Sequence, residues 1–65
     1  MSLYDYRVSQ EIAARDEPFY ALLMAVMRKA DTDNTAKLKA AWPDVWEELF
    51  QRYHAPGGFL EGEAE

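Results

Sequence analysis

Few side chains of this 65-residue chain could serve as nucleophiles, general bases or metal ligands. His54 is the only histidine and cysteine is absent, so one chain cannot assemble a histidine or thiolate metal cluster. Ser2 and Ser9 lack the glycine-flanked context of a nucleophile elbow. Glu47 and Glu48 are adjacent, and adjacent side chains diverge by about 100° on a helix, which does not suit a paired-carboxylate site. The sequence therefore predicts a protein that is not an enzyme and holds no metal or cofactor.

The polar residues after the central apolar run are the best candidates for holding a small anion. If one helix continues through this region, Arg28, Asp31 and Asn34 follow at three-residue steps, with Lys37 one step further. Such a ridge could hold a phosphate, and a tyrosine could stack on a base. The predicted ligand-binding residues are Arg28, Lys29, Asp31, Asn34, Lys37, Tyr20 and Tyr53.

Residues 31–35, Asp-Thr-Asp-Asn-Thr, decide between two arrangements of this region. All five side chains compete for backbone hydrogen bonds, so we predict a tight turn in which one of them caps a third helix. Arg28 and Lys29 would then only compensate the dipole at a helix C-terminus. The alternative is a continuous helix, because a heptad-like series runs through the segment: Met24, Met27, Asp31, Asn34, Leu38 and Ala41. Asp31 and Asn34 would then form a buried polar layer that fixes register and oligomer state.

The element that must organise the fold is the stretch from Glu17 to Ala30, in which residues 19–27 are all apolar or aromatic. It is too short to cross a bilayer, which needs ~20 apolar residues. A helix that is apolar on every side must be buried on every side. Asp16 and Pro18 are helix-start signals in front of it. We predict that the other segments wrap this helix and leave part of it for a second copy of the chain.

Three further short helices are predicted from their caps and apolar spacing. Ser2 could cap the first, over residues 3–15, whose apolar stripe at Tyr4, Val8 and Ile12 should lie on the core. Another follows the turn, and Pro43 begins the last, which the run at 55–58 ends. The predicted fold is all-α: a small bundle of three to four short helices around a central apolar helix, completed by homo-oligomerisation. Residues 1–58 form the domain, and residues 59–65 a flexible acidic tail.

Large contact residues are abundant for a chain of this size, with 14% aromatic residues, two tryptophans and three methionines. Most should pack in the core. A chain this small buries only about 60% of its unfolded surface, so some should face a partner, where Trp, Tyr and Met are common. The predicted interface residues are Met24, Met27, Trp42, Trp46 and Phe50.

The formal net charge of −5 and its distribution limit the partners. Residues 28–41 are basic on balance and residues 42–65 acidic, so the basic segment could meet a small anion or the acidic segment of a second copy. An acidic chain is not expected to bind duplex DNA. No secretion signal or membrane segment is recognisable, so we expect a cytoplasmic protein.

A motif over residues 16–58 resembles small uncharacterised proteins encoded by bacteriophages and prophages. It reads Asp16-x-Pro18-Phe19-x-x-Leu22, Met24-Ala25-x-Met27-Arg28-x-Ala30-Asp31-x-x-Asn34, Trp42-Pro43-x-Val45-Trp46-x-x-Leu49 and Arg52-Tyr53-x-x-Pro56-Gly57-Gly58. The resemblance implies a phage or prophage source and the bacterial host cytosol, without an established activity. Proteins of this kind are often stoichiometric binders of host factors.

Three functions follow from these expectations. The first is a non-enzymatic interaction protein that self-associates and binds a host or phage protein. The alternative is an oligomeric binder that sequesters nucleotide-like anions made by host defences. The third is a structural or assembly component.

Overall fold

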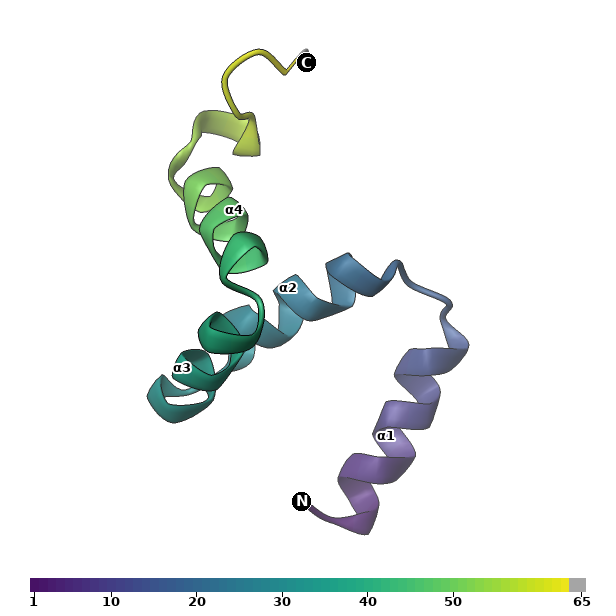
Figure 1. Ribbon diagram of the computed structural model, residues 1–65. Helices are drawn as coiled ribbons and strands as arrows, with labels where there is room; N and C mark the ends of the chain where they lie inside the picture. Colours follow the sequence, from purple (N-terminus) through teal and green to yellow (C-terminus); the bar gives the residue numbers. More distant parts are fainter. Residues whose placement is uncertain (64–65) are drawn as a thin grey trace.

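The chain folds into four α-helices and one 3₁₀ turn over the residues that the structure describes. The computed structural model describes residues 1–63, and the last two residues of the predicted tail, Ala64 and Glu65, lie outside the described residues. Its elements are α1 (Leu3–Ala14), α2 (Phe19–Lys29), α3 (Thr32–Ala41), α4 (Pro43–His54) and the 3₁₀ turn η1 (Pro56–Gly58) (Figure 1). Throughout residues 1–63 the regular structure is helical, which confirms the predicted all-α class.

The predicted turn between the second and third helices is present. Ala30 is extended (φ −67°, ψ 141°), which ends α2, and Asp31 is the N-cap of α3. The Asp31 carboxylate accepts a hydrogen bond from the amide of Asn34 at 2.8 Å. The alternative of one continuous helix with Asp31 and Asn34 in a buried polar layer is therefore wrong. The capping bond satisfies an amide that a helix end leaves unpaired.

Replacing Asp31 with alanine should lower the free energy of unfolding by about 1 kcal/mol, because the α3 N-terminus loses its capping acceptor. Urea denaturation followed by circular dichroism would measure the change. Asp31→Asn keeps an acceptor and is the matched control, with a loss of only a few tenths of a kcal/mol. Equal losses for the two variants would contradict a capping role.

The core lies where α4 crosses α2. Leu23 and Met27 of α2 meet Val45 and Leu49 of α4, and these four side chains form the buried cluster within residues 1–63. Met24, Leu38 and Trp46 are half-buried against it. Pro43 starts α4 at its first position, as predicted, and places the apolar side of α4 over α2.

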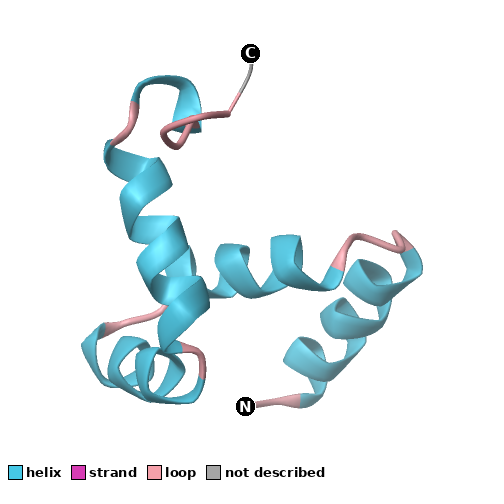
Figure 2. Cartoon of the chain, turned by 45° about the horizontal axis from the view of Figure 1, so that its top comes forward, coloured by secondary structure: helices cyan, strands magenta, loops and turns pink. Residues whose placement is uncertain are grey.

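Helix α1 does not lie on this core, so the predicted packing of its apolar stripe is wrong within one chain. All of its residues are exposed except Val8, which is half-buried. Figures 1 and 2 show α1 at the N-terminal end of α2, apart from α3 and α4. The reason is the connection: Asp16 adopts the left-handed conformation (φ 52°), and Pro18 rather than Asp16 is the N-cap of α2. The chain thereby turns α1 away from the core.

Helix α2 is covered along one side. Phe19, Tyr20 and Val26 are exposed, so a single chain does not provide the all-round burial that the sequence predicts. The Cα radius of gyration is 14.0 Å, against about 11 Å for a compact domain of this length. The described residues include no helix both long and apolar enough to cross a membrane.

Candidate functional site

The first candidate site is the α2–α4 hollow, a cavity of about 500 Å³ between the C-terminal ends of these helices. Val45 and Leu49 of α4 face α2, and the aromatic side chains beside them form one wall of the hollow, opposite Met27 and Arg28 of α2. The hollow is mainly apolar, with two basic side chains among its lining residues, which are Met27, Arg28, Trp46, Leu49, Phe50, Tyr53 and His54.

Aromatic contacts position the polar groups of the α2–α4 hollow. The Arg28 guanidinium lies 5.6 Å from the ring centroid of Tyr53, within cation–π range. The His54 ring lies 4.6 Å from the Phe50 ring and 5.3 Å from the Tyr53 ring. His54 is also the last residue of α4, where a basic group interacts favourably with the helix dipole. These contacts give the hollow a cationic, aromatic rim suited to binding.

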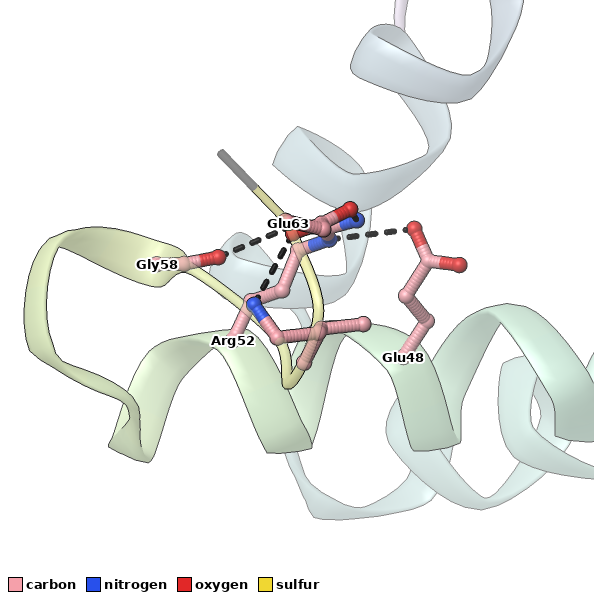
Figure 3. Close-up of polar contacts among 5 residues, drawn as sticks. Glu48, Arg52, Gly58 and Glu63 are labelled. Carbon is pink, nitrogen blue, oxygen red and sulfur yellow. Dashed lines mark hydrogen bonds and ion pairs between the residues drawn. The ribbon is translucent and has the colours of Figure 1, made fainter. Parts of the chain in front are cut away.

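The C-terminal segment folds back on α4 through one arginine. Arg52 pairs with Glu63 through two contacts of 2.7 Å, and its Nε contacts Glu48 at 3.2 Å (Figure 3). It also donates to the carbonyl oxygen of Gly58 at 2.8 Å. Gly57 (φ 63°) and Gly58 (φ 75°) reverse the chain, a conformation that glycine adopts without strain.

The ion pair with Arg52 keeps Glu63 ionised in acid. The hydrogen bonds from Arg52, then the bond from the Leu60 amide, lower the pKa of Glu63 to about 2 from 4.5. Hydrogen bonds to Glu63 and then to Glu48 raise the pKa of Arg52 above its ordinary value. The sequence gives no sign of this pair, because Glu63 lies in the segment predicted to be a flexible tail.

Replacing Arg52 with glutamine should raise the pKa of Glu63 toward its ordinary value of 4.5, because the largest cause of the lowered pKa is removed and only the hydrogen bond from the Leu60 amide remains. In the native protein the pKa of Glu63 is lower in the folded than in the unfolded state. The Arg52–Glu63 ion pair therefore contributes fully to folding stability above pH 4.5, and this contribution is lost as the pH falls toward 2. Titration of the side-chain carboxyl by NMR would measure both forms. Arg7→Gln, on exposed α1, is the matched control and should leave Glu63 unchanged. Identical titration of Glu63 in both variants would contradict the ion pair.

The predicted ligand-binding residues are spread over different faces. Arg28 and Tyr53 meet in the α2–α4 hollow. Lys29, Asp31 and Asn34 line a separate hollow of about 440 Å³ beside α3. These two groups are not brought together, because the chain turns at Ala30 and the residues do not follow one another along a single helix.

The remaining two predicted ligand residues lie elsewhere again. Tyr20 lines a cavity of about 270 Å³ together with Asp44 and Glu48, whose negative charges repel an anion. Lys37 is exposed on α3.

The predicted interface residues differ in their accessibility. Met27 belongs to the core, with 3% of its surface exposed, and Met24 and Trp46 are half-buried against that core. Trp42 and Phe50 are exposed. Residues available to a partner are therefore those on the outer edge of α4, where Phe50 borders the α2–α4 hollow.

A second candidate site, the α1–α2 groove, was not anticipated from the sequence. It is a hollow of about 670 Å³ on the side of α2 that faces away from the core. Its floor is the small and branched apolar residues of α2, and charged side chains form its rim. The lining residues are Ile12, Arg15, Glu17, Ala21, Leu22, Ala25, Val26 and Lys29.

Comparisons with known proteins add no relative. No protein-family model matches the chain, and neither a curated protein nor a solved structure matches it. Within residues 1–63, no three side chains of His, Asp or Glu gather in the manner of a metal site.

Proposed function

We propose that the protein is a non-enzymatic interaction protein of phage or prophage type that self-associates and binds a host or phage protein. The observation that carries this proposal is the accessible surface of 5704 Å². A compact monomer of 7.5 kDa exposes about 4,200 Å², so this chain exposes roughly 1,500 Å² more. A standard interface buries about 800 Å² per partner, and the excess is large enough for one.

The character of this excess surface also supports association. Large aromatic and branched side chains are exposed on α1, α2 and α4, where a solitary protein this small would shelter them. The exposed residues on these helices include Leu3, Tyr4, Tyr6, Phe19, Tyr20, Val26, Phe50 and Tyr53. Burial of such surface is the main driving force of protein association.

Sedimentation equilibrium or light scattering at micromolar concentration tests self-association. We expect a mass of at least twice the 7.5 kDa of one chain. A folded species of 7.5 kDa over the whole concentration range would remove the proposal's main support.

The α2–α4 hollow is the surface that we assign to the partner protein. It combines the exposed aromatic residues Phe50 and Tyr53 with an arginine, and aromatic residues and arginine dominate binding energy at interfaces. For a candidate partner, Tyr53→Ala should weaken binding at least tenfold, measured by calorimetry. Gln51→Ala, two residues earlier on α4 and outside the hollow, is the control and should bind like the native chain.

A nucleotide-like anion is the second candidate ligand, and the Arg28–Tyr53 contact favours it. An arginine beside an aromatic ring can pair with a phosphate while the ring stacks on a base. Linear and cyclic nucleotides should then raise the melting temperature, because a ligand that binds only the folded state stabilises it. The shift should disappear in Arg28→Ala. No shift with any nucleotide of the panel would exclude this candidate.

A further inference from the structure

Helix α2 has two opposite apolar sides, and the fold uses one. Leu23 and Met27, four residues apart, face the core. Ala21, Leu22, Ala25 and Val26 lie on the other side and form the floor of the α1–α2 groove. The groove is open to a helix, and its two alanines allow a close approach of helix axes.

Helix α1 is the element of this chain that needs such a surface. It has 12 residues, and a helix of this length is marginal in water without packing. Its stripe of Tyr4, Val8 and Ile12 is mainly exposed, with Tyr4 at 74%. Only the C-terminal end of α1, through Ile12 and Arg15, borders the groove of its own chain, so most of the stripe and most of the groove floor stay uncovered.

The connection between α1 and α2 brings only the C-terminal end of α1 to the groove of its own chain. The amides of Arg15 and Asp16 donate to the carbonyl oxygens of Ile12 and Ala13 at 3.1 Å, which forms a tight turn after α1. Pro18 (φ −58°) then starts α2 at once, and its carbonyl oxygen accepts from the Leu22 amide at 3.0 Å. With this short linker α1 points away from the contact between α2 and α4 (Figure 1).

We infer that α1 of each copy packs in the α1–α2 groove of a second copy, and that the exchange is reciprocal. This inference rests on the proposed self-association and names the surfaces that produce it. A reciprocal contact has the two-fold symmetry of most homodimers. The excess surface of roughly 1,500 Å² per chain falls in the range of obligate dimers, which bury about 1,000–2,500 Å² on each side. The charges of the two surfaces also match: Asp5 and Glu11 of α1 complement Arg15 and Lys29 at the groove rim, and Arg7 of α1 complements Glu17 there.

Two tyrosines of α1 provide a matched pair of variants. Tyr4 and Tyr6 are 74% and 62% exposed, and being two residues apart they point about 200° apart around the helix. Tyr4→Glu places a charge on the stripe and should weaken the dimer about a hundredfold, because each dimer loses two buried rings. Tyr6→Glu makes the same substitution on the opposite side and should leave the dimer intact. Sedimentation velocity at about 10 µM measures both.

The outcomes of this pair separate the inference from the proposed function. If the native protein is a monomer, self-association and the inference both fail. If the native protein is a dimer and Tyr4→Glu dimerises like Tyr6→Glu, the inference is overturned and self-association stands. Both positions are exposed in one chain, so loss of the dimer cannot be attributed to loss of the monomer fold.

Disulfide trapping identifies the contact directly, because the native chain has no cysteine. Chains carrying Val8→Cys should form a mixed disulfide with chains carrying Ala25→Cys when the two are combined under oxidising conditions. Gln10→Cys, on the opposite side of α1, replaces Val8→Cys in the control and should not crosslink. A chain with both Val8→Cys and Ala25→Cys that gave a monomeric disulfide would show α1 closing on its own groove, and would overturn the inference.

Discussion

Replacing Met27 with alanine is expected to remove most or all of the stability of the fold. Met27 is the most buried residue among positions 1–63, with 3% of its surface exposed, and it joins α2 to α4 in a core of four side chains. A buried methionine truncated to alanine costs about 2–5 kcal/mol. A chain of 65 residues has roughly 3–10 kcal/mol of stability in total. Circular dichroism with urea titration should show loss of the cooperative transition.

Two variants act as controls for the Met27 prediction. Met27→Leu conserves volume and should cost less than about 1.5 kcal/mol. Met24→Ala makes the same truncation at a half-buried position of α2 and should cost less than Met27→Ala. A native-like urea midpoint in Met27→Ala would contradict the assignment of the core to this contact.

The elements were predictable because local chemistry sets them. Asp31 caps a helix wherever its carboxylate can reach the third following amide, and Pro43 starts one because its missing amide hydrogen is not needed there. The helix-ending role of Pro56 and Gly57 follows from the same local preferences. Such preferences depend on few neighbours, so the sequence alone identifies them.

The direction of α1 could not be predicted from its sequence. An apolar stripe requires a cover but does not say whether the cover belongs to the same chain. The left-handed backbone of Asp16 decides the direction, and aspartate adopts that conformation only in certain contexts. The sequence instead suggested Asp16 as a helix cap, which is the commoner use of the residue.

The candidate site was only partly predictable for a similar reason. The predicted anion ridge required a continuous helix, and once α2 ends at Lys29 its members separate. Tyr53 lies on α4, and its meeting with Arg28 depends on how α4 crosses α2, which no local pattern encodes. The Arg52–Glu63 pair joins residues eleven positions apart across three glycines of positive φ, and helical spacing gives no signal for it.

The melting temperature of the native protein is expected to rise with protein concentration. If two chains unfold together, each tenfold rise in concentration adds about 1.4 kcal/mol to the stability of the dimer. Two chains of 65 residues have an unfolding entropy of about 0.27 kcal/mol/K, so the melting temperature should increase by about 5 °C per tenfold. Differential scanning calorimetry between about 1 and 100 µM measures a shift of about 10 °C.

The variants of α1 show whether the shift arises from the proposed surface. Tyr6→Glu should melt like the native protein at each concentration, whereas Tyr4→Glu should melt at a lower temperature than Tyr6→Glu because its dimer is weaker. A constant melting temperature of the native protein would mean that the open side of α2 needs no second chain. The exposed apolar surface of one chain would then be compatible with stable folding, and binding of a different partner would be the remaining reason for it.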